Sequence, residues 1–534
     1  MNTKKSQVTG TDKTYKKLIL VIIALAIVAL MYNLGIMSFI GDEALRSLVS
    51  MEMHYRNNYI MPTTNGEFYF SKPPLYNWIL LTFFYVYGSV DEWIARFPTV
   101  IFTLLFTFTI YHFYKNTFET KRWAILLALM FLTCGRIMFW DSFLALIDIF
   151  FSLLMFLMFM LAYRFGHKEN KWMFFFSLYG LGFLGFMLKG FPAPMFLAIT
   201  MMTYITMYKK WSWLLSKFHL FNVLIFGGFV ALYYYLYNHS YEASETVAPL
   251  LEQATKRTIL KYPVVDVLKH IVTYPFENLY HFLPWSIFAL LLIRPDFIKK
   301  IKENDLINYS FWCFIANVSV YWVSPEVFPR YVLMLVPLIF AVFTYFLQFE
   351  IKLPTWRLKI ANSLLYFIAL ILPVGVYVVF FVDETDVVNH LVLKTVFISI
   401  LMAVTIWLIF KYRQYFYYFI VIDILLLRIF FDAVIMPSRA VYSHTTQVKN
   451  ESIALARKYE PLHVYKDTRL FFNNLFYITN EKDQLIDKQS VLLPQHFYVI
   501  DSLDWQSNFA DKTMKVDSVM DGEFRQKRYV IKLK

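Results

Sequence analysis

The sequence predicts a mainly α-helical, polytopic membrane protein with about thirteen transmembrane helices and a small C-terminal extracytoplasmic α/β domain. Three observations support this fold class. First, 58% of the 534 residues are hydrophobic and only 17% are charged, against about 25% charged in ordinary soluble domains. Second, apolar runs of about 20 residues recur along the chain. Third, the composition beyond Pro437 becomes that of a soluble domain. Together they exclude a soluble globular enzyme, a disordered chain and a disulfide scaffold.

The first predicted span follows a lysine-rich N-terminus and runs from Leu18 to about Met37. It is longer than the apolar core of a cleaved signal peptide, so we expect it to remain as a helix. The run from Leu75 to Gly88 has only 14 residues and predicts an interfacial or re-entrant helix. The other predicted spans begin near Ile94, Trp123, Phe143, Trp172, Phe191, Phe218, Leu279, Tyr309, Tyr331, Ala361, Leu391 and Gln414.

Basic residues gather in alternate loops, on the same side of the membrane as the N-terminus. Examples are Lys115, Lys121 and Arg122, and then Lys209, Lys210 and Lys217. This bias places the N-terminus in the cytoplasm of a multi-pass inner-membrane protein. It also accounts for most of the net charge of +13, so we expect membrane lipids, and no nucleic acid, as partners.

The same orientation divides the chain into two predicted domains. A transmembrane domain covers residues 1–436, with extracytoplasmic loops at about 38–93 and 238–278. Residues 437–534 form the soluble extracytoplasmic domain. Its helix is predicted at KNESIALARKY, and its strands at HVYKD, HFYVID and RYVIKL.

Two carboxylates follow the first span directly. Asp42 and Glu43 lie in IGDEALRSLVSMEMHY, at the predicted outer surface of the membrane. Either could act as a base or bind a cation. The alternative is that Asp42 is the N-cap of a helix beginning at Glu43.

Lys72 precedes two prolines in FYFSKPPLYNWIL. Proline is favoured in the first turn of a helix, so Lys72 is expected at a helix N-terminus. Such a position suits a phosphate. The alternative is a lysine that extends its charge to the membrane surface.

Asp141 and Asp148 lie in FWDSFLALID, seven residues apart. On one helix this spacing would place both on the same face, about 10 Å apart. We expect Asp141 to cap the outer mouth and Asp148 to lie about two turns deeper in the bilayer. Ionisable residues at that depth are costly and usually functional, although a structural pair with a base is the alternative for Asp148.

Several cations are predicted on the outer side. Lys189 ends the fifth span in MLKGFPAP, Arg330 precedes Tyr331 in FPRYVLMLVP, and the second loop contributes Arg257 and His270. Because this placement opposes the positive-inside rule, an anionic lipid ligand explains the set better than individual surface lysines do. Arg428 and Asp432, four residues apart, fit a structural pair.

Motifs at this spacing resemble the GT-C membrane glycosyltransferases. The resemblance is to glycosyltransferase family 39, the dolichyl-phosphate-mannose-protein mannosyltransferase-like group, near the bacterial aminoarabinose (lipid A) transferases. It covers about Leu18 to Phe349. The motifs are IGDEALR, FYFSKPPLYNW, the ARFP at residues 95–98, FWDSFLALID, MLKGFPAP, FLPWSIF and FPRYVLMLVP.

The resemblance implies an inverting enzyme that moves a sugar from a polyprenyl-phosphate carrier, such as undecaprenyl phosphate, to a lipid, glycan or protein acceptor. The transfer would occur on the outer side of the cytoplasmic membrane. Asp42 would be the catalytic carboxylate with Glu43 beside it, and Asp148 or Asp141 the acid of the mouth. The carrier phosphate and substrate would be bound by Lys72, Lys189, Arg257, Arg330 and Tyr331.

The sequence predicts no certain cofactor. In aminoarabinose transferases the residue before the motif lysine is acidic, whereas here it is Ser71. A divalent metal ion therefore stays open, with Glu43 and His270 as candidate ligands. The sequence contains no Walker loop, and no GxGxxG motif follows a predicted strand, so a nucleotide donor is not suggested.

Three other functions remain as alternatives. An enzyme of the same fold could glycosylate protein Ser or Thr. A lipid or ion transporter would need a polar path through the bilayer and commonly has internal repeats, and no such repeat is found in this sequence. The third alternative is a sensor or structural membrane protein with a binding tail, but it does not explain why Asp42, Lys72, Asp148 and Lys189 are all present on the outer side.

Overall fold

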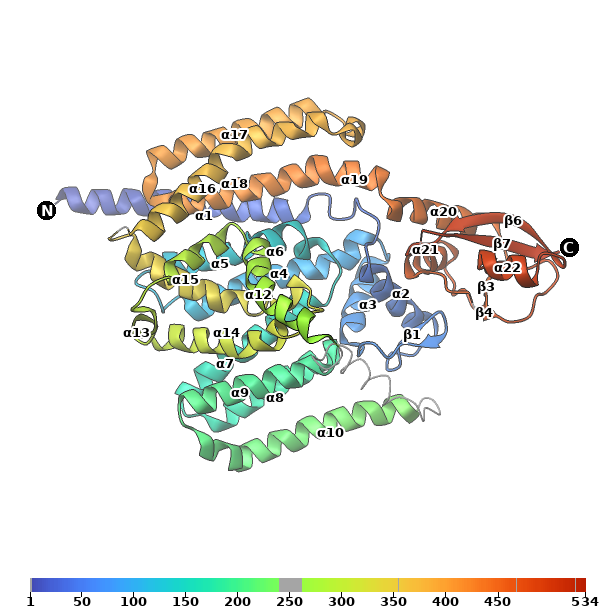
Figure 1. Ribbon diagram of the computed structural model, residues 1–534, viewed down its shortest axis with the longest axis horizontal. Helices are drawn as coiled ribbons and strands as arrows, with labels where there is room; N and C mark the ends of the chain where they lie inside the picture. Colours follow the sequence, from blue (N-terminus) through green and yellow to red (C-terminus); the bar gives the residue numbers. More distant parts are fainter. Residues whose placement is uncertain (1, 240–261, 354, 467, 524) are drawn as a thin grey trace.

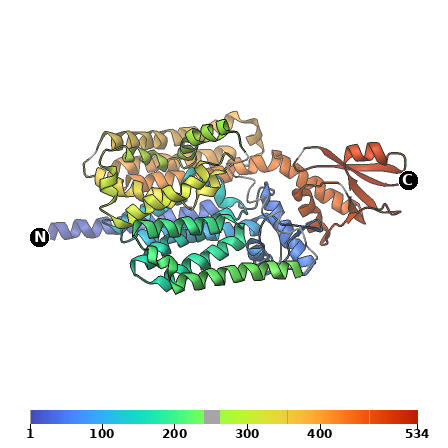
Figure 2. The same ribbon diagram turned by 60° about the horizontal axis from the view of Figure 1, so that its bottom comes forward.

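A bundle of helices carries a small sheet at one end, and the two chain termini lie at opposite ends of the molecule (Figures 1 and 2). The structure is a computed structural model that describes residues 2–239, 262–353, 355–466, 468–523 and 525–534. The juxtamembrane helices α2 (Asp42–Tyr55) and α3 (Leu75–Tyr87) lie between the bundle and the sheet (Figure 1). The predicted fold class, mainly helical with a C-terminal sheet, is confirmed.

Seven helices in the described ranges are long and apolar enough to cross a membrane. They are α1 (Asn2–Met31), α4 (Glu92–Tyr114), α7 (Asp148–His167), α8 (Lys171–Lys189), α10 (Lys217–His239), α16 (Trp356–Gly375) with its 3₁₀ extension Val376–Phe381, and α17 (Leu391–Lys411).

The remaining predicted spans coincide with shorter or interrupted helical pieces, so the count of about thirteen stays a prediction. These pieces are α5 (Lys121–Leu132), α6 (Gly135–Phe139), α9 (Pro192–Met207), α14 (Asp305–Trp322), α15 (Val336–Glu350), α18 (Phe416–Phe430) and the 3₁₀ turns η1 (Asp141–Phe143), η4 (Trp285–Leu292) and η5 (Pro329–Val332). Helix α12 (Val264–His281) lies almost entirely in the predicted second loop, α13 (Phe297–Ile301) lies in a predicted basic loop, and α19 (Met436–Tyr442) lies at the predicted domain boundary. Helix α3 has 13 residues and is the short helix expected at residues 75–88.

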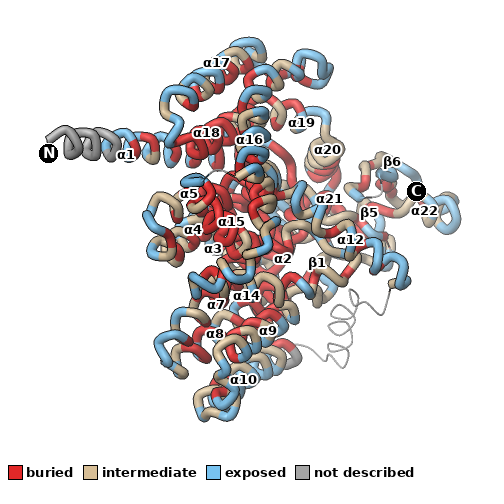
Figure 3. The backbone as a smooth tube through the Cα atoms, turned by 60° about the vertical axis from the view of Figure 1, so that its left-hand side comes forward, coloured by how far each residue is buried: buried red, intermediate tan, exposed pale blue. Residues whose placement is uncertain are grey.

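Burial follows the layers of the bundle. Buried backbone concentrates on the central helices α5, α15 and α18, whereas α10 and α17 expose much of their length (Figure 3). The exposed faces are apolar: Leu224 on α10 is 75% exposed and Phe397 on α17 is 59% exposed. Apolar surface of this kind requires lipid as its solvent.

The C-terminal part contains a mixed sheet of five strands in the order β4-β3-β5-β7-β6. Strand β3 (Leu462–Tyr465) pairs in parallel with β4 (Lys488–Gln489) and β5 (Phe497–Ile500), and β7 (Lys527–Leu533) pairs antiparallel with β5 and β6 (Thr513–Met520). Helices α20 (His444–Lys458), α21 (Phe472–Lys482) and α22 (Ser502–Asn508) complete this part. The helix and three strands expected from the sequence are all present.

The two-domain division at residue 437 stays a prediction. Helix α18 continues through a π-helical turn (Phe431–Ile435) into α19, so the chain is still helical on both sides of Pro437. The next helix, α20, starts after Ser443, whose side chain accepts a hydrogen bond from the Thr446 N–H.

Asp141 and Asp148 do not share one helix face, so this prediction was wrong. After the 3₁₀ turn at Asp141–Phe143 the backbone becomes extended at Leu144, and α7 begins only at Asp148. Side chains from other segments replace the helical hydrogen bonds: the Ala145 N–H donates to Glu43 at 2.7 Å, and Thr99 donates to the Leu144 carbonyl at 2.9 Å. Asp148 is therefore the first residue of a helix, where a carboxylate is favoured.

Helix α8 supplies a test of the bundle. A Cβ added at Gly185 would lie 2.9 Å from the Ala193 Cβ of α9 and 2.6 Å from the Met155 Cε of α7. Overpacking of this kind costs about 1–3 kcal/mol. We expect Gly185→Leu to lower the detergent-solubilised melting temperature clearly. Gly180→Leu, on the same helix with nothing within 4 Å, is the matched control, and equal melting temperatures for the two variants would contradict this packing.

Candidate active site

A cavity of about 450 Å³ lies where the first loop meets the starts of α2, α3 and α7, the end of α8 and the turn η5. Its charged lining residues are Asp42, Arg46, Lys72, Asp148, Lys189 and Arg330. Four of these side chains are basic and two are acidic, which gives the lining a net charge of +2. Five of the residues singled out from the sequence thus come together with Tyr331 around one space.

Asp42 enters the cavity as the first residue of α2. The preceding Gly41 has φ 58° and is itself the N-cap, so Asp42 is not the N-cap. A positive φ is a conformation that glycine adopts without strain. The Asp42 side chain is 54% exposed, and Arg330 Nη2 lies 4.0 Å from its Oδ2. Its carboxylate can therefore reach a substrate in the cavity.

Asp148 forms ionic contacts with two cations that line the cavity. Lys189 Nζ lies 2.6 Å from Asp148 Oδ1, and Arg330 Nε lies 3.4 Å from Oδ2. Asp148 begins α7 and Lys189 ends α8, so each charge is on the side that the helix dipole favours. Both side chains are buried, and without its partner either charge would carry a large desolvation cost.

Aromatic rings support the same cations. Lys189 Nζ lies 4.0 Å from the centroid of the Tyr331 ring, and the Arg330 guanidinium lies 4.5 Å from the centroid of Phe328. Within the described ranges, the buried Nε of Arg330 forms no hydrogen bond, although it has the ionic contact with Asp148. A buried donor without an acceptor is costly, and an anion entering the cavity would satisfy it.

Lys72 and Arg46 complete the basic lining. Pro73 and Pro74 lead directly into α3, which begins at Leu75, so Lys72 lies just before a helix N-terminus as predicted. Arg46 is buried, with its guanidinium 5.5 Å from the Tyr69 ring centroid, and sequence reasoning missed it. The available signal was its spacing of four from Asp42, which places both on one side of a helix.

Glu43 does not line the cavity, in contrast to its predicted place beside Asp42. Its carboxylate is completely buried and binds Arg96 through two hydrogen bonds of 2.8 and 2.9 Å. It also accepts the backbone N–H groups of Ile40 and Ala145 at 2.9 and 2.7 Å. Both oxygens are therefore already used, and this residue acts on the site by fixing its backbone.

The predicted metal ligands do not form a site. Glu43 is bound to Arg96, and His270 contacts the carbonyl of Tyr321 at 3.2 Å through Nε2. Among the residues that the structure describes, no three His, Cys, Asp or Glu side chains gather in a way that could hold a metal ion. We therefore assign no step to a metal.

Two other predicted residues lie elsewhere. Asp141 forms a two-hydrogen-bond pair with Arg136 at 2.7 and 3.1 Å and is not part of the cavity lining. Arg257 lies outside the described residues.

Arg428 and Asp432 form the structural pair that their spacing predicts, with 2.7 Å between Nε and Oδ2. Both side chains are buried, and Arg428 also donates to the carbonyl of Met138. Arg428 thus joins α18 to α6, and neither residue of the pair lines the cavity.

Comparison with known proteins confirms the resemblance to GT-C glycosyltransferases. Residues 71–235 match the family described as dolichyl-phosphate-mannose-protein mannosyltransferase. No curated protein matches the chain in sequence.

Solved structures show where the fold recurs. ArnT from Cupriavidus metallidurans bound to undecaprenyl phosphate has a TM-score of 0.67 and 14% identity, covering 96% of this chain and 97% of that one. Its apo state has a TM-score of 0.68 and 14% identity, covering 97% and 98%. At this identity the likeness establishes the fold over nearly the whole length of both chains.

The Glu43–Arg96 pair yields a stability test. Arg96→Met leaves the Glu43 carboxylate buried without its charge partner, at a cost of about 3–5 kcal/mol. We expect a large drop in melting temperature, with part of it restored in Arg96→Met/Glu43→Gln because neither charge remains. The exposed pair Lys352–Glu119 (58% and 43% exposed) is the control and should contribute about 0–1 kcal/mol. If Glu43→Gln lowered the melting temperature of Arg96→Met further instead of restoring part of it, the assignment of Glu43 and Arg96 as a buried ion pair would be contradicted.

Proposed function

We propose that the protein is an integral-membrane glycosyltransferase that moves a sugar from a polyprenyl-phosphate carrier to an acceptor. The observation that carries the proposal is the cavity, whose lining combines a net charge of +2 with an accessible carboxylate, Asp42. Charged groups aimed at a phosphate stabilise it strongly in such a partly enclosed site. The ArnT structure that shares this fold was solved with undecaprenyl phosphate, which supports a lipid-linked donor.

The proposed roles follow from the contacts. Lys72, Lys189 and Arg330 bind the carrier phosphate and neutralise the charge that develops as it leaves. Asp148 keeps Lys189 and Arg330 in place. Asp42 takes the proton from the acceptor hydroxyl as that oxygen attacks the anomeric carbon. Attack on the face opposite the departing phosphate inverts the configuration there.

We further propose that transfer takes place on the outer side of the inner membrane. The N-terminus lies at the end of the bundle opposite to α2, α3 and the sheet (Figure 1), and the basic loops predict that the N-terminal side is cytoplasmic. The cavity then opens outside, where lipid-linked sugars, and not nucleotide sugars, are the available donors. The acceptor in this proposal is a lipid such as lipid A, another glycan or a protein.

Asp42 provides the direct test. In a purified, reconstituted assay with undecaprenyl-phosphate-linked hexose or aminopentose, we expect Asp42→Asn to lower kcat about 10²–10⁴-fold, because it removes the base. Retention of undecaprenyl phosphate should persist because the cations remain.

Asp91→Asn is the matched control, since Asp91 is an exposed acid of the same loop that lines no part of the cavity. Full activity of Asp42→Asn would remove Asp42 as the base. Wild-type protein that transports a lipid across proteoliposomes and transfers no sugar would overturn the proposed function.

A further inference from the structure

We propose that Asn473 and Tyr477, on α21 of the C-terminal part, are positioning residues for Asp42. They hold the backbone of Phe39, three residues before the carboxylate. The inference rests on the proposed function, in which Asp42 is the catalytic base. It gives the C-terminal part a role in the reaction itself.

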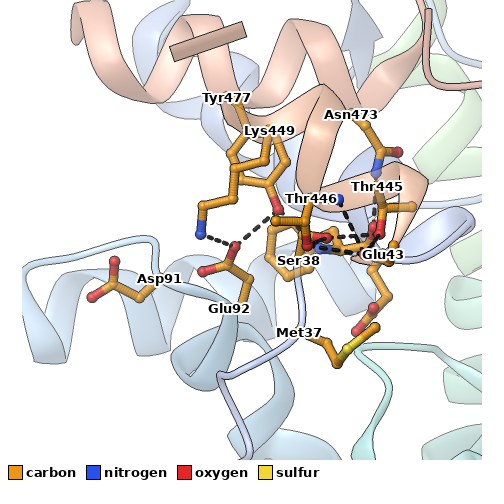
Figure 4. A network of polar contacts seen from close by, with 12 residues as sticks. Met37, Ser38, Glu43, Asp91, Glu92, Thr445, Thr446, Lys449, Asn473 and Tyr477 are labelled. Carbon is orange, nitrogen blue, oxygen red and sulfur yellow. Dashed lines mark hydrogen bonds and ion pairs between the residues drawn. The ribbon is translucent and has the colours of Figure 1, made fainter. Parts of the chain in front are cut away.

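Both backbone groups of Phe39 are held by side chains from α21, and Figure 4 shows Asn473 and Tyr477 of this helix together with Ser38, the residue before Phe39. The Phe39 N–H donates to the Tyr477 hydroxyl at 2.9 Å, and the Asn473 amide donates to the Phe39 carbonyl at 2.7 Å. The Phe39 ring is completely buried and lies 4.8 Å from the Phe476 ring centroid, edge to face. Two side chains more than 430 positions away in the chain therefore form the hydrogen bonds to Phe39 that a neighbouring strand would form in a sheet.

The Tyr477 hydroxyl also connects this contact to the membrane domain. It donates to Glu92 Oε1 at 2.9 Å, and Lys449 Nζ binds the same oxygen at 2.6 Å. Burial, with Glu92 beside it, raises the pKa of the Tyr477 phenol well above its ordinary value. The hydroxyl thus stays protonated, so it donates to Glu92 while it accepts from Phe39.

The same stretch of backbone is held from its other side by α4. Arg96 donates to the carbonyls of Met37 and Ser38 at 2.9 and 3.1 Å, and Ser38 Oγ donates to Thr445 at 2.7 Å. Residues 37–39 are thus held by side chains from both α4 and the C-terminal part.

The fixed backbone determines where Asp42 lies. Beyond Phe39, the Ile40 N–H binds Glu43, and Gly41 turns the chain into α2. Among the residues that the structure describes, the Asp42 carboxylate has only a 4.0 Å contact with Arg330, so its placement depends on the backbone that carries it. A displacement of about 1 Å at a reacting group can cost about 10²-fold in rate.

Asn473→Asp and Asn474→Asp form a matched pair that tests the proposal. In Asn473→Asp an oxygen replaces the amide that donates to Phe39. Asn474 is the next residue and equally buried, but its amide donates to Ser452 and to the Met520 carbonyl, inside the C-terminal part. A merely structural role would make the Asn474 substitution at least as harmful.

We expect Asn473→Asp to lower kcat at least ~10-fold while KM for the lipid-linked donor stays within about twofold of wild type. Asn474→Asp should lower the melting temperature and leave kcat unchanged. Tyr477→Phe is a second variant that keeps the ring, and it should show the same split between kcat and KM. The Kd for undecaprenyl phosphate, measured directly, should be unchanged in all three variants.

Unchanged kcat in folded Asn473→Asp or Tyr477→Phe would overturn the inference, as would an equal loss of kcat in Asn474→Asp. If Asn473→Asp fails to fold, Tyr477→Phe decides alone. The assay separates this failure from that of the proposed function. Wild type without transfer overturns both, whereas active wild type, inactive Asp42→Asn and fully active α21 variants overturn only the positioning role.

Discussion

The buried ion pair between Glu43 and Arg96 joins the three segments from which the cavity is built. Arg96 belongs to α4 and binds the carbonyls of residues 34, 37 and 38 as well as Glu43. Glu43 in turn binds the backbone of Ile40 and of Ala145. Asp42 lies between these anchors, and Ala145 belongs to the extended stretch that ends at Asp148. Because an unpaired charge at such depth is strongly unfavourable, the first loop, α4 and the start of α7 keep one relative position.

The second constraint is electrostatic. The cavity is lined by four cations: Lys72, Lys189, Arg330 and Arg46. These positive charges would repel one another without acidic partners. Asp148 is such a partner, with contacts of 2.6 Å to Lys189 and 3.4 Å to Arg330. The lining keeps a net charge of +2, and within the described residues the Nε of Arg330 has an ionic contact with Asp148 but no hydrogen bond, so the cavity can accommodate an anion. Asp42 remains half exposed beside it. The arrangement separates a carboxylate that holds cations, Asp148, from a carboxylate that is accessible to accept a proton, Asp42.

The sequence was sufficient for the features that depend on composition and local rules. Hydropathy predicted the helical membrane fold, and Pro73 and Pro74 predicted that Lys72 precedes a helix. Cations on the unexpected side of the membrane pointed to Lys189 and Arg330. Other features depend on contacts between distant segments. Glu43 is buried because it pairs with Arg96, whereas Asp42 stays accessible in the cavity. The interruption of the helix between Asp141 and Asp148 is stabilised by hydrogen bonds from Ala145 to Glu43 and from Thr99 to Leu144. The hydrogen bond from Asn473 to Phe39 joins residues 434 positions apart, and no local sequence pattern predicts it.

The most direct test of the central claim, that the cavity binds a polyprenyl phosphate, is native mass spectrometry of the protein purified in mild detergent. Wild type is compared with Lys72→Ala and with Lys168→Ala, an exposed lysine of the loop between α7 and α8. The account predicts a retained polyprenyl phosphate, or its sugar-linked form, in wild type and Lys168→Ala, and its depletion in Lys72→Ala. Equal retention in all three proteins, or no binding by any of them after saturation with undecaprenyl phosphate, would contradict it.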